Sequence, residues 1–148
     1  MTKRTLAKRT LEGLHYSPWT DRALWVLDHH GLDYDYVEHQ ILFGMPLLRW
    51  RMGEWREPLT VPAMVEEGGL VFRDSLEIAR HADELGTKTK LFSQDLDSDA
   101  IVRWNEVSER ALDAGRALLI GAISADKQAQ VEQLPPWVPR MLLSLIHI

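Results

Sequence analysis

Two short stretches of this chain combine hydroxyl and carboxylate groups with the signals that begin a helix. Ser17 precedes Pro18. A serine hydroxyl can accept a hydrogen bond from an unpaired N–H of the first turn, and proline suits the first helical position. Further on, Asp74 precedes Ser75 and is followed three positions later by Glu77, the spacing of a capping box. The N–H groups and the macrodipole of a helix N-terminus favour negative charge, so the helix after Ser17 offers a place to bind an anion.

The residues around Ser17 predict a strand, a turn and a helix. A strand is expected near residues 10–14. Its apolar segment at 11–14 precedes the Ser-Pro pair, and Gly13 inside it indicates a bulge or a close backbone approach. Gly31 suits the left-handed end of the helix. The residues expected on the buried helix face follow a helical spacing: Trp19, Ala23, Val26, Leu27 and His30. A second strand at 33–39, rich in Tyr and Val, completes a βαβ unit, which implies parallel strands.

The next part of the chain predicts a hairpin and another helix. A mixed segment at 47–55 is interpreted as a short helix. Residues 63–66 and 70–72 form two short strands around the Gly68-Gly69 pair, which supplies the backbone freedom of a tight turn. The helix that begins after Asp74 ends at Gly86, and its buried face is expected to hold Ser75, Ile78, Ala82 and Leu85. The predicted order is β-α-β-α-β-β-α, an α/β fold with two parallel strands followed by an antiparallel pair.

A second, all-helical part is expected after a polar linker at 87–96. A long helix begins near Asp97, because apolar residues recur at steps of three and four over about six turns. This stripe consists of Ile101, Trp104, Val107, Ala111, Ala114, Leu118 and Ala122. The chain ends in an apolar run at 141–148, and we expect residues 97–148 to be a truncated helical domain.

Composition excludes several classes of function. The 148 residues include no cysteine, which excludes disulfide scaffolds, thiolate metal sites and dithiol redox chemistry. The net charge of −5 does not favour a nucleic-acid partner, and no apolar run is long enough to cross a membrane, so we expect a cytoplasmic protein. The basic segment 1–9 is interpreted as a solvated tail. No metal site is predicted, because the adjacent His29 and His30 point about 100° apart on a helix.

Taken together, these motifs resemble the cytosolic glutathione S-transferase family. The resemblance rests on the element order, the Ser-Pro-Trp-Thr turn at 17–20, the Val61-Pro62 pair before a hairpin, the Asp74-Ser75 helix start and the long helix after a linker. The expected thioredoxin-like N-terminal domain (GST N-terminal domain) spans residues 1–86. The resemblance covers about residues 10–86 and the opening of the helical domain. Ser17 stands where one branch of the family has a cysteine, and residues 57–60 depart from the Asn-Pro-x-Gly that often precedes the Val-Pro pair.

The resemblance implies a glutathione-binding enzyme. Val61 would pair its backbone with the cysteinyl part of glutathione, and its bond to Pro62 would be cis. Asp74 and Ser75 would hold the γ-glutamyl end, with Ser75 offering a hydroxyl and a backbone N–H to the carboxylate. Ser17 would donate to the glutathione sulfur, which then attacks a small electrophile as a thiolate. Glutathione would be a co-substrate, and no separate cofactor is implied.

Several alternatives stay open at this stage. Tyr16 is a rival hydroxyl donor, since other branches of the family use a tyrosine near the same strand end. The motifs at 17–18 and 74–77 also suit plain helix caps, and the Val61-Pro62 pair suits an ordinary loop. Trp19 and Trp104, like Trp25, fit core or domain-interface positions, although Trp19 and Trp104 could instead line an electrophile pocket. Three arginines are expected in solvent, with one a possible partner of the glycyl carboxylate: Arg49, Arg51 and Arg56.

The motifs are compatible with two classes of function. The first is a transferase that acts in detoxification, and family members usually form dimers. The second is a non-catalytic module that keeps the fold for protein interaction.

Overall fold

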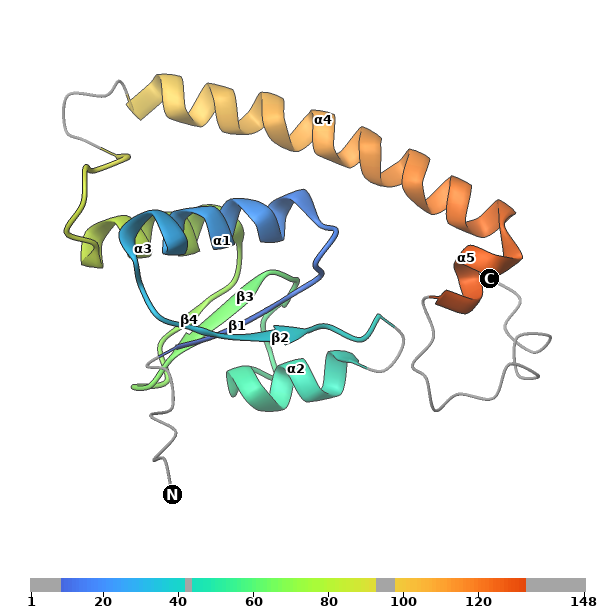
Figure 1. Ribbon diagram of the computed structural model, residues 1–148, viewed down its shortest axis with the longest axis horizontal. Helices are drawn as coiled ribbons and strands as arrows, with labels where there is room; N and C mark the ends of the chain where they lie inside the picture. The colour runs from blue at the N-terminus through green and yellow to red at the C-terminus, as the bar shows by residue number, and fades with distance from the viewer. Residues whose placement is uncertain (1–8, 42–43, 93–97, 133–148) are drawn as a thin grey trace. The chain divides into compact units, whose positions relative to one another are not determined.

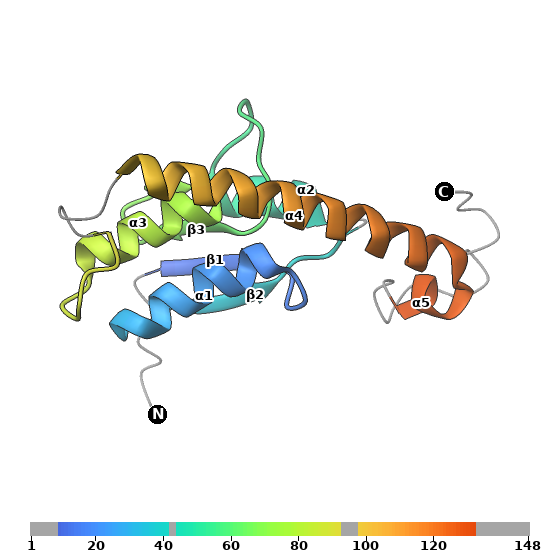
Figure 2. The same ribbon diagram turned by 90° about the horizontal axis from the view of Figure 1, so that it is seen from above.

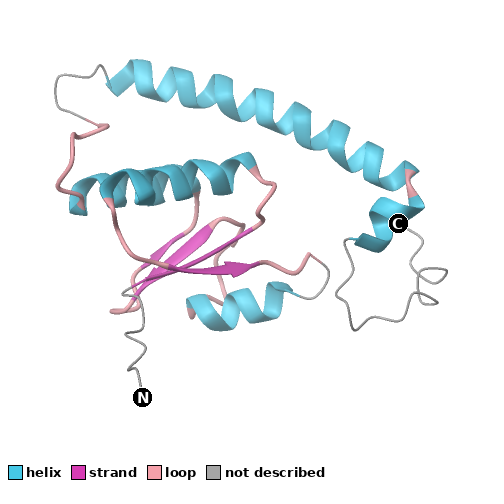
Figure 3. Ribbon diagram, in the orientation of Figure 1, coloured by secondary structure: helices cyan, strands magenta, loops and turns pink. Residues whose placement is uncertain are grey.

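The structure is a computed structural model that describes residues 9–41, 44–92 and 98–132. The chain divides into two compact units, residues 1–93 and 94–148. Figure 3 shows that strands occur in the first unit, while the described part of the second unit consists of helices joined by a short turn.

The first unit is built on a four-stranded sheet with strand order β2-β1-β3-β4. The strands are β1 (Arg9–Gly13), β2 (Asp35–Glu38), β3 (Ala63–Glu66) and β4 (Val71–Phe72). β1 runs parallel to β2, β1 and β3 are antiparallel, and β3 and β4 form the hairpin. This topology confirms the predicted α/β, thioredoxin-like fold with two parallel strands followed by an antiparallel pair.

Helices cover both faces of this sheet. Helices α1 (Pro18–His30) and α3 (Ser75–Leu85) lie side by side on one face, and α2 (Gly44–Met52) lies on the other (Figures 1 and 2). The core on the α1/α3 side is formed by Leu11, Ala23, Val26, Leu27, Met64, Ile78, Ala79 and Ala82. A smaller cluster on the α2 side is formed by Leu48, Met52, Leu59 and Ala63.

Local signals set the bounds of α1 as the sequence predicts. Ser17 is the N-cap residue, Pro18 opens the helix, and Gly31 ends it in the left-handed conformation, with φ 65° and ψ 35°. Gly13 makes the predicted close approach, because a Cβ at this position would lie 2.6 Å from Thr20 Cγ2. The end of β1 is thereby pressed against the first turn of α1.

Some details of the first unit differ from the sequence-based expectations. Helix α2 begins at Gly44, three residues before the predicted segment 47–55. Trp25, assigned to the core or an interface, is 60% exposed and stacks on His29 one turn later, with 5.7 Å between the ring centroids. It lies off the helix face that Ala23 and Val26 bury. Leu85, expected on the buried face of α3, is 47% exposed, and Asp83 is buried instead.

The described part of the second unit contains the long helix α4 (Ser98–Ala125) and the short helix α5 (Lys127–Glu132). Asp126 separates them and caps α5, accepting hydrogen bonds from the N–H groups of Gln128 and Ala129 at 2.8 and 3.3 Å. The apolar run at 141–148, on which the expected truncation rests, lies outside the described residues. Across the ranges that the structure covers, no helix is both long and apolar enough to cross a membrane.

Candidate active site

Ser17 lies at the turn between β1 and α1. Its N–H donates to the carbonyl of Leu14 at 2.9 Å, and its carbonyl accepts the N–H of Asp21 at 3.0 Å, the first bond of the helix. The residue is 9% exposed, and within the described part of the chain its side chain makes no capping hydrogen bond. The hydroxyl therefore lies at a helix N-terminus without being used to hold that helix together.

Tyr16 precedes Ser17 and is partly exposed, with its ring edge-on to that of His15 at 5.2 Å. Partial burial and the nearby carboxylate of Glu38 raise the pKa of Tyr16, so the phenol stays protonated at neutral pH. Glu38 anchors this turn, since its Oε1 lies 2.9 Å from His15 Nδ1 and its Oε2 accepts the Tyr36 hydroxyl at 2.8 Å. Desolvation opposes the charge on Glu38, but these hydrogen bonds outweigh it and lower its pKa.

The peptide bond between Val61 and Pro62 is cis, as the family resemblance implies. Pro62 is buried at the entry to β3, and Val61 packs against the apolar cluster on the α2 side of the sheet. Val61 thus lies where the chain leaves a loop and joins the sheet.

The loop before Val61 is held by charged side chains. Arg49 donates to the carbonyls of Glu54 and Glu57 at 3.3 and 3.2 Å. The Glu54 carboxylate accepts hydrogen bonds from the N–H groups of Arg56 and Glu57, and from Arg73 Nη2 at 2.6 Å. The bond from the Arg56 N–H, followed by those from Arg73 and the Glu57 N–H, lowers the pKa of Glu54 to about 2. This network ties the loop to the segment that leads into α3.

Asp74 is the N-cap residue of α3. Its Oδ1 accepts the N–H groups of Leu76 and Glu77 at 2.8 and 2.9 Å. Its Oδ2 accepts no hydrogen bond from the residues that the structure describes. The side chain of Glu77 accepts the N–H of Arg73, one residue before the cap, so the predicted capping box is shifted by one position on that side. One oxygen of Asp74 holds the helix, and the other is left for a cationic group.

Ser75 follows directly and is 1% exposed. Its Oγ accepts hydrogen bonds from Arg22 on α1, from Nε at 3.0 Å and from Nη2 at 2.5 Å. Sequence reasoning missed Arg22, because its partner lies 53 positions away and no local motif marks it. In the structure, the Arg22 guanidinium thus joins Asp74 and Ser75, the pair that the sequence placed at the start of α3.

A family model described as glutathione S-transferase, N-terminal domain, matches residues 16–85. The matched residues make up most of the first unit, which is thus similar to a glutathione S-transferase N-terminal domain. A solved structure described as "Leishmania TDR1 - a unique trimeric glutathione transferase" aligns with a TM-score of 0.48 and 20% identity, over 62% of this chain. The chain spans only 20% of the length of that protein. No curated protein matches the sequence.

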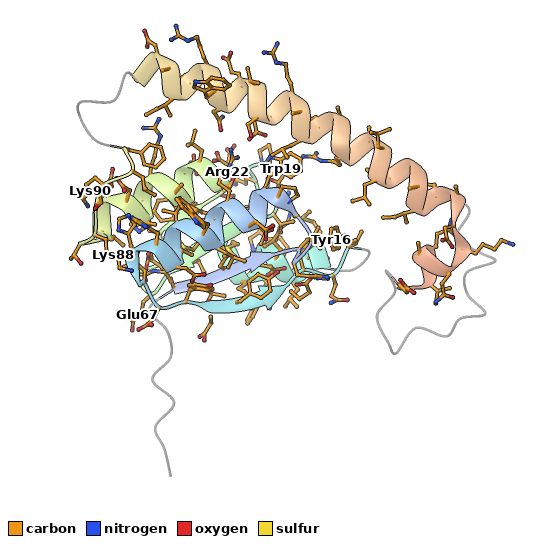
Figure 4. All side chains as sticks on the ribbon, turned by 45° about the horizontal axis from the view of Figure 1, so that its top comes forward. Tyr16, Trp19, Arg22, Glu67, Lys88 and Lys90 are labelled. Carbon is orange, nitrogen blue, oxygen red and sulfur yellow. The ribbon has the colours of Figure 1, made fainter. Side chains whose placement is uncertain are left out.

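The expected site residues come from separate elements. Figure 4 shows Tyr16, Trp19 and Arg22 at the N-terminal end of α1. Trp19 is half-buried there. Trp104 belongs to α4 in the second unit and is 74% exposed. The assignment of Trp19 and Trp104 to an electrophile pocket stays a prediction.

A buried polar cluster lies on the α2 side of the domain and was not predicted. Glu12 on β1 is 2% exposed, and its carboxylate pairs with His39 Nδ1 at 2.7 Å and with Arg51 on α2. Desolvation lowers the pKa of His39. Arg51 and Arg49, both expected in solvent, thus have partners inside the domain, while Arg56 is exposed. Among the described residues, no group of three or more His, Asp or Glu side chains is arranged to hold a metal ion.

Proposed function

We propose that this chain binds reduced glutathione and activates its thiol as a thiolate for attack on a small electrophile. The observation that carries the proposal is the hydroxyl of Ser17. It lies at the N-terminus of α1, is almost buried, and makes no capping hydrogen bond within the described residues. A hydroxyl in this position can donate to a sulfur anion, while the macrodipole of α1 adds favourable potential.

The size of these two effects is sufficient for activation. A free thiol has a pKa of about 8.5, so lowering it by about two units requires roughly 2.7 kcal/mol. One hydrogen bond to a charged acceptor contributes roughly 1.5–3 kcal/mol, and a helix terminus roughly 0.3–1 kcal/mol. The two together supply the required free energy without a general base.

The reaction follows from this activation. The thiol proton leaves to solvent, and the sulfur lone pair forms a bond to an electrophilic carbon while a leaving group departs or an adjacent π bond takes up the electrons. Tyr16 is the competing donor to the sulfur, since its phenol stays protonated at neutral pH. A matched pair of variants at Tyr16 and Ser17 therefore separates the two assignments.

The rest of the glutathione molecule would extend from Ser17 toward α3. The backbone of Val61, next to the cis bond, would pair with the cysteinyl residue as an added strand does. The unused Oδ2 of Asp74 would accept the γ-glutamyl ammonium, and the start of α3 at Ser75 would receive the α-carboxylate. The proposal includes a homodimer, a cytoplasmic location and a role in detoxification, supported by the family resemblance.

A calorimetric titration of reduced glutathione into the chain tests this proposal. We expect saturable binding that Ser75→Ala weakens by about tenfold, because the variant removes a hydroxyl from the carboxylate end of the site. Ser108→Ala on α4 is the matched control and should bind as the wild type does. A folded wild-type sample that binds no glutathione would overturn the transferase and favour the interaction module.

A further inference from the structure

His15 lies in the turn that leads into α1, two residues before Ser17. The N–H of Ser17 donates to the carbonyl of Leu14 at 2.9 Å, so residues 14–17 form a hydrogen-bonded turn with His15 and Tyr16 at its centre. The first and last Cα atoms of such a turn lie within about 7 Å of each other. A charge on the His15 ring is therefore close enough to act on an anion that is bound at Ser17.

Glu38, the last residue of β2, holds His15 in place. Its Oε1 accepts the backbone N–H of His15 at 3.3 Å and lies 2.9 Å from Nδ1 of the ring. Desolvation opposes the charge on Glu38, but hydrogen bonds from His15 and Tyr36 lower its pKa, so the group is a carboxylate at neutral pH and only accepts hydrogen bonds. Nδ1 therefore carries the hydrogen of this contact, and Nε2 is the nitrogen that can take up a second proton.

The titratable groups of the first unit around this ring favour a positive charge on it. Tyr16 packs edge-on against His15 at 5.2 Å, and Tyr36 donates to Glu38 Oε2 at 2.8 Å. Partial burial, with the charge of Glu38, raises the pKa of both phenols, so they stay neutral at neutral pH. Asp21, in the first turn of α1, adds a further negative charge near Tyr36. Two carboxylates, Glu38 and Asp21, thus favour an imidazolium at His15.

The position of His15 couples its protonation to the charge of a bound ligand. The side chain is 74% exposed, so a proton can reach the ring directly from water. Histidine changes its charge near neutral pH, and a neighbouring anion favours the charged form. A thiolate at Ser17 would therefore increase the proton affinity of His15. The imidazolium would stabilise the thiolate by the same free energy, because coupling between two binding events is reciprocal.

We propose that His15 takes up a proton from solvent when the glutathione thiolate forms at Ser17, so that the bound state holds an imidazolium beside the thiolate. The thiol proton leaves to water and a proton from water binds Nε2, so atoms and charge balance. Glu38 is a positioning residue, because it holds the ring and neutralises the imidazolium. This inference rests on the proposed function, because it adds a charged group to the same thiolate site.

The test counts the protons that are released when reduced glutathione binds. Calorimetric titration at about pH 7.5, where a free thiol is still mostly protonated, is repeated in buffers with different enthalpies of ionisation. His15→Gln cannot take up a proton, so we expect this variant to release more protons than the wild-type chain, by about half a proton per bound glutathione. If His15 only shaped the turn, the variant would form less thiolate and release fewer protons.

Three further variants complete the design. His15→Lys carries a fixed positive charge, so it should keep the low thiol pKa of the wild-type complex while releasing as many protons as His15→Gln. Glu38→Gln removes the charge that neutralises the imidazolium, and its proton release should also rise above that of the wild type. His29→Gln is the matched control, because this ring lies in the last turn of α1 and pairs with the carbonyl of Thr89 at 3.0 Å. Its proton release should equal that of the wild type.

Proton release from His15→Gln that is equal to or lower than that of the wild type would overturn the assignment of His15. A rise of the same size in His29→Gln would also overturn it, because the effect would not depend on the turn. If circular dichroism shows that His15→Gln is unfolded, the comparison of Glu38→Gln with the wild type decides in the same way. A folded wild-type chain that binds no glutathione, or whose complex shows no thiolate absorbance, would overturn the proposed function as well, and both results are recognised in the wild type alone.

Discussion

At the scale of single residues, the two N-cap side chains, Ser17 and Asp74, differ in whether they hold their helix. Both residues begin helices, but Asp74 accepts two backbone hydrogen bonds while the Ser17 side chain makes no capping bond within the described residues. A cap side chain normally stabilises its helix by satisfying unpaired N–H groups. The Ser17 side chain does not stabilise α1 in this way, so its hydroxyl can donate to a ligand.

This difference predicts unequal costs for the two alanine variants. Asp74→Ala should lower the free energy of unfolding by about 1 kcal/mol, because it removes both cap bonds of α3. Ser17→Ala should change it by about 0.5 kcal/mol or less. Urea denaturation of both variants measures the difference, and equal losses would mean that Ser17 caps α1 in solution.

Glu54 predicts a dependence of stability on pH. Hydrogen bonds from the Arg56 N–H, from Arg73 and from the Glu57 N–H lower its pKa from 4.5 to about 2. The unfolded chain therefore binds a proton more readily, and this contribution to stability is present above pH 4.5 and lost as the pH falls toward 2. In denaturation series across this range, Glu54→Gln should show a shallower loss of stability than the wild type.

The matched control for Glu54 is Glu67→Gln in the β3–β4 turn. The Glu67 side chain is exposed and forms no hydrogen bond within the described ranges, so the variant should follow the wild-type pH profile. A Glu54→Gln profile that is parallel to the wild type would contradict the network at this loop.

At the scale of elements, the C-terminal ends of α1 and α3 meet at a glycine that is required for space. Gly86 ends α3 with φ −68° and ψ 151°, a conformation open to any residue. A Cβ there would lie 2.0 Å from Nδ1 of the His30 ring, whose Nε2 pairs with the buried Asp83 at 3.0 Å. The glycine thus allows α1 and α3 to approach closely enough for the buried pair to form.

Replacement of this glycine should destabilise the first unit. Gly86→Ala is expected to cost about 1–3 kcal/mol in the free energy of unfolding, because the His30 ring must move away from Asp83. Gly68→Ala is the control, since a Cβ there meets nothing within 4 Å. Thermal unfolding of the two variants checks this, and similar midpoints would show that the ring has room to move.

Some helices could be predicted from the sequence more accurately than others, because their ends carry local signals. Helix α1 carries local signals at both ends, Ser17 with Pro18 and Gly31, and its predicted bounds are confirmed. Helix α2 has no such caps. The helix predicted from its mixture of arginines and tryptophans is shifted by three residues from the helix in the structure. Trp25 was assigned to the core or an interface although it lies outside the periodic face of α1, and it is 60% exposed.

Contacts between distant segments were also beyond sequence reasoning. The sequence places Ser75 at a helix start, but it contains no sign that Arg22, 53 positions earlier, donates to it. Burial of Glu12 with His39 depends equally on how β1 and the end of β2 come together in space. Sequence motifs could therefore suggest the candidate site, whereas the charged and polar partners of its side chains could be found only from the structure.

At the scale of the whole molecule, every proposed glutathione contact lies in the first unit. Among the described residues, both apolar clusters of that unit consist of residues between 11 and 92. A domain with its own core can fold independently. Glutathione binding would then not require the second unit.

This division predicts the behaviour of a shortened chain. A fragment of residues 1–93 should fold and bind reduced glutathione with the affinity of the full chain, while Trp104 is absent from it. Circular dichroism and calorimetric titration of the fragment check the two parts of the prediction. A folded fragment with much weaker binding would place part of the glutathione site in residues 94–148.

The most direct test of the account is a pH titration of the ultraviolet absorbance of the glutathione thiolate bound to the chain. The account predicts a bound thiol with a pKa about two units below the free value of about 8.5, a return toward the free value in Ser17→Ala, and no change in Tyr16→Phe. A lowered thiol pKa that persists in Ser17→Ala, or that is lost in Tyr16→Phe instead, would contradict the assignment of Ser17.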